Sequence, residues 1–134
     1  MRRLAFNPRF VNEAGNDLMP GKIHTIRQNY EFWKRFEGKE IALFTWEGKP
    51  YRSRQKVFCT KRIVSVQEVY LYDFYGSRYF LRFQHPTDDN QIFDDHCMAA
   101  NDGFEDLFEF QVWFNRKDYP PGKMAIIHFT DFRY

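Results

Sequence analysis

Three side chains with the chemistry of an acyl-transfer or anion-binding site lie close together between Pro20 and Arg27, in the sequence PGKIHTIR. A threonine hydroxyl such as that of Thr25 is a weak nucleophile and needs a base beside it. The amine of Lys22 can serve as that base where burial or a neighbouring cation lowers its pKa. Arg27 can supply that cation, or it can bind a carbonyl or phosphate oxygen. The stretch therefore indicates a nucleophile, a base and an anion-binding group.

The path of the backbone decides whether these groups meet. Two isoleucines flank Thr25 and favour a strand, in which Thr25 and Arg27 point to one face and Lys22 to the other. Only a bend at Pro20–Gly21 brings the amine round to the hydroxyl. The same alternation is typical of an ordinary half-buried strand with a solvated face, and composition alone favours that interpretation. His24 points away from Thr25 by the same alternation, which favours a structural role for it.

Asp102 stands where a helix is expected to begin. Residues 104, 107, 108, 111 and 114 have the spacing of one helix face, and all but residue 111 are apolar. Asp102 lies three residues before Glu105, the spacing of a capping box with a carboxylate cap. In that position the helix dipole would keep the carboxylate ionised and weakly basic.

The other expected elements are mostly strands. Strands are expected at residues 4–6, from residue 23, and at 41–46, 55–72, 78–83 and 123–132, with a helix at 30–36 that ends at Gly38. Neither face of the 55–72 run is cleanly apolar, which is typical of a long bent strand. This order favours an α+β fold over a doubly wound sheet. The expected architecture is a small mixed β-barrel of about six strands with two or three short helices at its rim. Residues 1–134 are long enough for a single domain.

Composition limits the class of protein. The net charge is +2, which argues against wholesale binding of a polyanion. No window reaches the roughly 20 apolar residues of a membrane span, and the first residues lack the apolar core of a secretory signal. We therefore expect a cytoplasmic protein with no membrane partner. Cys59 and Cys97 are expected to be free thiols, and neither a metal site nor a cofactor is predicted.

Aromatic residues make up 20% of the chain, and sixteen of them are phenylalanines. Most must fill the core, but exposed rings beside basic residues can stack on the bases of single-stranded RNA. Six residues form a candidate surface of this kind: Trp46, Tyr70, Tyr72, Tyr75, Arg52 and Arg54. Ordinary core rings and solvated arginines are the simpler alternative.

The stretch from Pro20 to Arg27 resembles the motif of the ASCH domain family, a branch of the PUA-like β-barrels. The family motif reads G-x-K-x-x-E/T-x-R, and Lys22, Thr25 and Arg27 match it in register. The match departs from the pattern at one point, because Pro20 stands at the glycine position and Gly21 follows it.

Two further features carry the resemblance, which extends from about residue 10 to the end. Asp102-Gly103-Phe104 matches an acidic residue before a Gly-Phe that opens a helix, and residues 126–129 are similar to the last strand of the family. The resemblance implies a barrel with a cleft that is lined by the motif and binds RNA or a nucleoside-like ligand. The residues assigned to this ligand are Arg27, Gly21, Trp46 and Arg54.

Small single-domain bacterial members look like amidohydrolases that deacylate an N-acylated cytidine. The resemblance then implies Thr25 as the nucleophile, Lys22 as the base, and Asp102 in place of a glutamate. Aspartate is shorter by one methylene, and a positional error of about 1 Å can cost roughly 100-fold in rate. Asp102 is therefore either a helix cap alone or a cap that also serves the site. A protein-interaction domain is the third alternative, and a monomer or weak dimer is expected.

Overall fold

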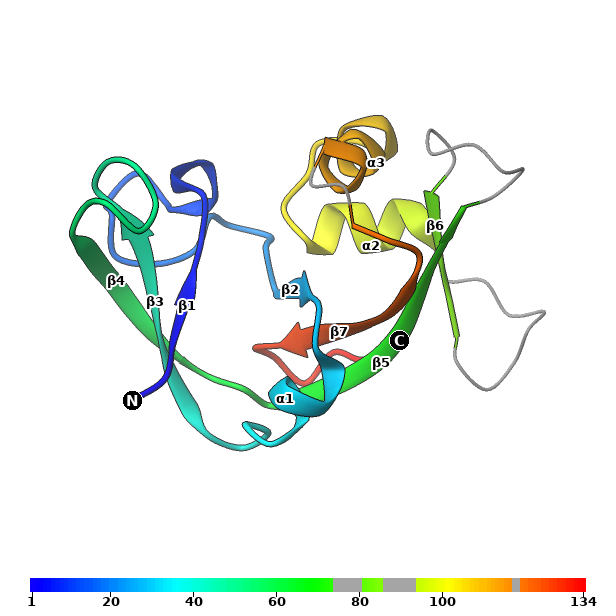
Figure 1. Ribbon diagram of the computed structural model, residues 1–134, viewed down its shortest axis with the longest axis horizontal. Coiled ribbons are helices and arrows are strands. Elements are labelled where there is room, and N and C mark those ends of the chain that lie inside the picture. Colours follow the sequence, from blue (N-terminus) through cyan, green and yellow to red (C-terminus); the bar gives the residue numbers. More distant parts are fainter. Residues whose placement is uncertain (74–80, 86–93, 117–118) are drawn as a thin grey trace.

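In the computed structural model, which describes residues 1–73, 81–85, 94–116 and 119–134, seven strands form two sheets (Figure 1). The first sheet, in the order β1-β3-β4, contains β1 (Arg3–Ala5), β3 (Glu40–Trp46) and β4 (Gln55–Arg62). The second, in the order β2-β7-β5-β6, contains β2 (His24–Arg27), β7 (Gly122–His128), β5 (Ser65–Asp73) and β6 (Leu81–Gln84). Neighbouring strands are antiparallel except β1 and β3, which are parallel.

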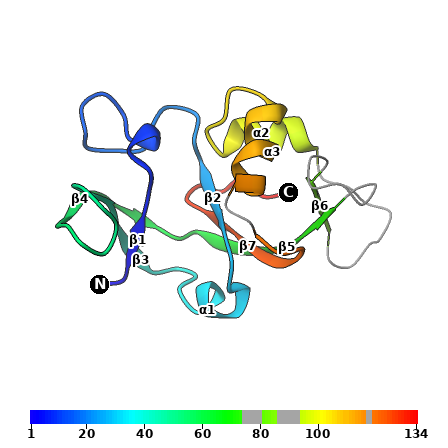
Figure 2. The same ribbon diagram turned by 45° about the horizontal axis from the view of Figure 1, so that its top comes forward.

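Three α-helices and one short 3-10 helix accompany these strands in the described residues. They are η1 (Pro8–Phe10), α1 (Tyr30–Lys34), α2 (Asp95–Asn101) and α3 (Leu107–Arg116). Both views place α1 on one side of the second sheet and α2 and α3 on the other (Figures 1 and 2). The helix expected at residues 30–36 is α1, and Gly38 follows it with a φ of 82°, in the left-handed region that glycine adopts easily.

The run expected as one long bent strand at 55–72 is two strands in different sheets. The chain leaves β4, passes through Ile63 and Val64, and enters β5. The amide of Ile63 donates to the carbonyl of Lys39, just before β3 of the first sheet, at 2.9 Å. The amide of Val64 donates to the carbonyl of His128, at the end of β7 in the second sheet, also at 2.9 Å. The expected bend is therefore the point at which the chain changes sheets.

The core is continuous and rich in aromatic rings. Phe83 of β6 lies against Phe110 and Phe114 of α3, with ring centroids 5.6 and 5.3 Å apart. Ile126 and Ile127 of β7 are both fully buried, although neighbouring residues of a strand point to opposite faces. This is because β7 lies between β2 and β5 and helices cover both sides of the sheet.

Asp102 is not the N-cap of a helix, and this part of the prediction is wrong. It follows the last residue of α2, where its amide donates to the carbonyl of Met98 at 3.0 Å. The helix expected from residue 104 begins at Leu107. The residue that does cap a helix is Asp94, whose carboxylate accepts from two amides at the start of α2, each at 3.1 Å.

The α+β class is thus confirmed by the structure, with seven strands and three α-helices in the described residues. Hydrogen bonds between these residues do not close the two sheets into one ring, so the barrel remains a prediction. The expected turn at 76–77 and the first residues of the expected strand at 78–83 lie outside the described residues. Within the described chain, each helix is too short or too polar to cross a bilayer.

Candidate functional site

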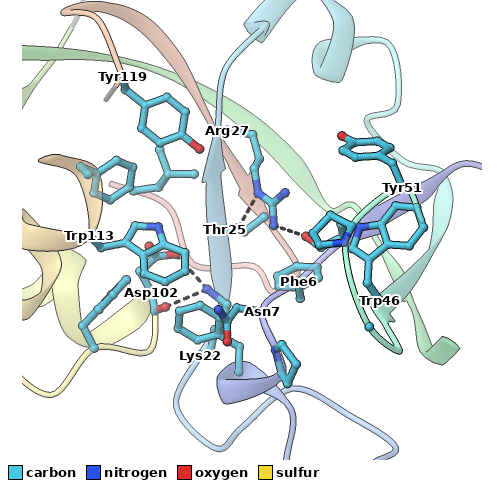
Figure 3. Close-up of a pocket in the computed structure, with 18 residues that line it drawn as sticks. Phe6, Asn7, Lys22, Thr25, Arg27, Trp46, Tyr51, Asp102, Trp113 and Tyr119 are labelled. Carbon is cyan, nitrogen blue, oxygen red and sulfur yellow. Dashed lines mark hydrogen bonds and ion pairs between the residues drawn. The ribbon is translucent and has the colours of Figure 1, made fainter. Parts of the chain in front are cut away.

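One cavity of about 360 Å³ collects the residues that the motif singled out. Lys22, Thr25, Arg27 and Asp102 all line it, between the segment that follows β1, the turn between β3 and β4, and helix α3 (Figure 3). A volume of this size falls within the range of small-ligand sites. The condition for any shared chemistry, that the amine, the hydroxyl and the carboxylate reach one space, is met.

The amine of Lys22 is held by Asp102 through two hydrogen bonds. Its Nζ donates to the backbone oxygen of Asp102 at 2.7 Å and to the carboxylate Oδ1 at 3.0 Å. Only 2% of the lysine side chain and 5% of the aspartate side chain are exposed. Burial lowers the pKa of Lys22, and the Asp102 carboxylate opposes this effect. The pair is therefore a buried salt bridge whose lysine releases its proton more easily than an exposed one.

Two glycines give Lys22 its position. Gly21 has a φ of 88°, and the turn that it completes lets the Lys22 amide donate to the carbonyl of Met19 at 3.2 Å. This is the bend expected at Pro20–Gly21. Gly103 has a φ of 90°, and a Cβ there would lie 3.2 Å from Cδ of Lys22. The residue beside Asp102 must therefore be small because the lysine chain passes over it.

Thr25 and Arg27 lie on one face of β2, as expected, and are bonded to each other. Nε of Arg27 donates to Oγ1 of Thr25 at 3.1 Å, and Nη2 donates to the carbonyl of Ala5 at 2.6 Å. The guanidinium also lies over the ring of Phe6, 4.9 Å from its centre. Burial lowers the pKa of Arg27, but a guanidinium stays charged in proteins. A cation therefore faces the hydroxyl oxygen and would stabilise negative charge on it.

The amine and the hydroxyl share the cavity but do not bond to each other. In the part of the chain that the structure describes, no hydrogen bond joins Nζ of Lys22 to Oγ1 of Thr25; Nζ donates to Asp102, and Oγ1 accepts from Arg27. Catalytic hydrogen bonds often tighten only when substrate is bound. Lys22 can act on Thr25 only if the two groups come within hydrogen-bonding distance when substrate binds.

Aromatic rings form two facing walls above these groups. Trp46 and Tyr51 lie on one side, with ring centroids 5.2 Å apart, and Trp113 and Tyr119 lie on the other (Figure 3). Tyr51 is 89% exposed and has a φ of 64°, which is uncommon for a residue with a side chain. Two walls of this kind are suited to a flat, apolar group such as a base.

The expected ligand residues divide into two groups. Arg27 and Trp46 line the cavity, whereas Gly21 and Arg54 are exposed and lie outside its lining. The aromatic, basic surface is also divided, because Tyr70 and Tyr72 line a separate hollow on β5. Tyr75, the sixth member of that surface, lies outside the described residues.

Sequence reasoning missed the role of His24. Its ring is fully buried and does not line the cavity, which agrees with the expectation that it points away from Thr25. Its Nδ1, however, lies 3.3 Å from Oδ1 of Asp102, behind the salt bridge to Lys22. The alternation of a strand, which places Lys22 and His24 on the same face, was the signal that could have found this contact.

Cys59 and Cys97 both carry free thiols. Within the described ranges, no three histidine, cysteine, aspartate or glutamate side chains gather as the ligands of a metal ion would.

Neither models of protein families, nor curated proteins, nor solved structures match this chain. Its function must therefore be inferred from the cavity and its surroundings.

Proposed function

We propose that this protein binds single-stranded RNA through one nucleoside that enters the cavity, as the resemblance to the ASCH domains implies. The supporting observation is that Arg27, Thr25 and Lys22 line one cavity that has aromatic rings on two sides. A base stacks between the walls, which is worth about 1–3 kcal/mol per base in such sites. Arg27 has donors left beyond its bonds to Thr25 and Ala5, and these bind a carbonyl of the base or a phosphate.

The distribution of charge favours a strand over a free nucleoside. Residues 1–62 contain 14 of the 20 lysines and arginines but only 6 of the 18 acidic residues, a net charge of +8, whereas residues 63–134 have a net charge of −6. The basic part includes the whole first sheet, which borders the cavity. A phosphate backbone would be attracted to this side of the molecule.

A second hollow offers a path for that backbone. It shares Ala5, Trp46 and Tyr51 with the cavity, and Arg2 and Arg3 line it while no acidic residue does. Tyr51 presents its ring at the ridge between the two hollows, from a backbone conformation that costs energy for a non-glycine residue. A strand with one base in the cavity can pass this ridge and place its phosphates near the two arginines.

The test is binding of short RNAs, followed by fluorescence anisotropy across a salt series, with cytidine as the competing free nucleoside. We expect RNA to bind with an affinity that falls as salt rises. Arg27→Ala should weaken binding about tenfold or more, because a charged hydrogen bond is worth roughly 1.5–3 kcal/mol. Arg35→Ala, which removes an exposed arginine just after α1, is the matched control. If Arg27→Ala leaves the affinity for RNA unchanged, RNA does not bind through this cavity and the proposal is wrong.

A second candidate function is an amidohydrolase that deacylates an N-acylated cytidine. The observation that favours it is that Lys22 is buried and meets Thr25 and Asp102 in one cavity. In this reaction Oγ1 of Thr25 attacks the amide carbon while its proton passes to a neutral Lys22. The bond from that carbon to N4 then breaks, and Lys22 returns the proton to N4 as cytidine leaves. Water then releases the acid from the threonine ester, and Arg27 stabilises the negative oxygen of each step.

Release of cytidine from N4-acetylcytidine is the test of this candidate. We expect Lys22→Met and Thr25→Val each to reduce the rate by at least about 100-fold, as loss of a base or a nucleophile does. Turnover that survives both substitutions would exclude the mechanism.

A further inference from the structure

A chain of buried hydrogen bonds leads from the cavity to Tyr134. Oδ1 of Asp102 accepts from Lys22 and lies 3.3 Å from Nδ1 of His24. The other ring nitrogen of His24, Nε2, lies 2.7 Å from the hydroxyl of Tyr134, and that hydroxyl accepts from Nδ2 of Asn101 at 3.2 Å. Neither proposed function uses His24 or Tyr134, yet both are linked to the one carboxylate of the cavity.

The donors and acceptors of this chain allow one arrangement of protons that adds no further charge. The Asp102 carboxylate accepts, so Nδ1 of His24 must carry a proton toward it. The amide of Asn101 donates to the oxygen of Tyr134, and the tyrosine proton points at Nε2 of His24 in this arrangement. This assignment leaves His24 neutral and the buried pair of Lys22 and Asp102 without net charge, which avoids the cost of a further buried cation.

We propose that His24 and Tyr134 are positioning residues: His24 shares the Asp102 carboxylate with Lys22, Tyr134 holds His24, and together they decide how firmly Lys22 retains its proton. One oxygen of Asp102 accepts from both Lys22 and His24. A carboxylate that already has a second donor gains less from the ammonium, so the second donor makes loss of the Lys22 proton easier. Tyr134 strengthens this donor, because a hydrogen bond to Nε2 polarises the ring and its Nδ1–H.

The other charged groups around the chain act in the same direction or stay neutral. Arg27 and Arg9 face Lys22 and disfavour its charge, in addition to burial. The His128 ring lies 5.5 Å from that of His24, and burial lowers the pKa of His128 to about 3, so it adds no charge at neutral pH. Burial also raises the pKa of Tyr134, which keeps its hydroxyl protonated. Asp102 is thus the acidic group that both Lys22 and His24 meet at close range in the described residues.

The backbone of Tyr134 is held in place by a second pair of contacts. Nε2 of Gln67 donates to the backbone oxygen of Tyr134 at 2.9 Å, and the amide of Tyr134 donates to Oε1 of Gln67 at 3.2 Å. Gln67 is itself buried on β5 and lies 3.0 Å from Nε2 of His128 through the same Oε1. The tyrosine hydroxyl therefore reaches His24 from a fixed anchor.

The test is direct titration of Lys22 by NMR in the full chain labelled with 15N-lysine, without any ligand. The Lys22 signal is identified by its loss in Lys22→Met. We expect His24→Leu to raise the pKa of Lys22 by about half to one unit, since removal of a donor leaves the carboxylate to the ammonium alone. His24→Asn keeps a donor at the place of Nδ1 and should restore the original value. Tyr134→Phe should produce a smaller rise in the same direction.

A second measurement needs no substitution. The 15N signals of the His24 ring at neutral pH should report a protonated Nδ1 and a bare Nε2. A proton on Nε2, or an unchanged Lys22 pKa in both His24→Leu and Tyr134→Phe, would overturn the proposal. If His24→Leu does not fold, Tyr134→Phe and the ring signals decide. None of these results depends on RNA binding or on turnover, so failure of either proposed function leaves this test intact.

Discussion

Buried polar residues are where single side chains matter most in this protein. His128 is fully buried, and its Nε2 donates to Gln67. Burial lowers the pKa of His128 to about 3, far below the usual value of 6.5. The folded state thus keeps His128 neutral over a range in which the unfolded chain takes up a proton.

This residue predicts a loss of stability in acid. Between about pH 6.5 and 3 the unfolded chain binds the extra proton, so the free energy of unfolding must fall as the pH falls. The contribution of this one group is on the order of 4 kcal/mol when the protein is taken from pH 7 to pH 3. Urea unfolding at several pH values measures it. His128→Gln keeps a donor for Gln67, and its stability should decline less in acid. Equal declines in the two proteins would contradict the assignment.

The turn after α2 shows what an element does for the site. Gly103 ends this turn with a φ of 90°, and atoms of Lys22 and Met19 lie only 3.2 Å from the position that its Cβ would take. Gly38, after α1, has a similar φ of 82° but open space around it. A substitution of Gly38 thus tests the cost of the backbone conformation alone, whereas a substitution of Gly103 adds the cost of a contact with Lys22 and Met19.

We expect Gly38→Ala to lower the free energy of unfolding by about 1–2 kcal/mol, from its left-handed backbone alone. Gly103→Ala should cost about 1–3 kcal/mol more, because the lysine chain must move. It should also displace the Lys22 ammonium, which NMR of labelled lysine detects. If Gly103→Ala and Gly38→Ala lower the stability equally and the Lys22 signal does not move, the side chains around Gly103 accommodate the added methyl group without cost, and the prediction is wrong.

The sequence predicted the arrangement of the site residues within 20–27, but not their contacts with residues far away along the chain. Alternation on β2 was enough to place Thr25 and Arg27 on one face, and the Pro-Gly pair marked where the chain would have to bend. The helix α2 was missed because its seven residues are too few to show a clear apolar face. Asp102 was therefore assigned to the wrong helix end, although it does line the cavity.

The periodicity of the sequence also could not predict that the chain changes sheets between β4 and β5. The run 55–72 has strand character throughout, and only tertiary hydrogen bonds at Ile63 and Val64 divide it. Pairing partners far apart in sequence leave no local signal.

At the scale of the whole molecule, charge is divided between the two ends of the sequence. The basic first part contributes Arg2 and Arg3 to the hollow beside the cavity. If RNA follows this hollow, the double variant Arg2→Gln and Arg3→Gln should weaken RNA binding. The slope of log affinity against log salt concentration should also become shallower, by the amount that about two phosphate contacts contribute. Its affinity for free cytidine should not change, because neither arginine lines the cavity. An equal loss of affinity for RNA and for cytidine would show that the substitutions disturb the fold rather than a contact with phosphate.

The cavity also joins segments that are distant along the chain. Lys22 bonds to a residue 80 positions away, and His24 to one 110 positions away, whereas β3 and β4 are joined by a short turn. Contacts between distant segments require costly loop closure and form slowly. In refolding, amides of the β3–β4 hairpin should gain protection from hydrogen exchange before those of β2, and ligand binding should be the last property to return.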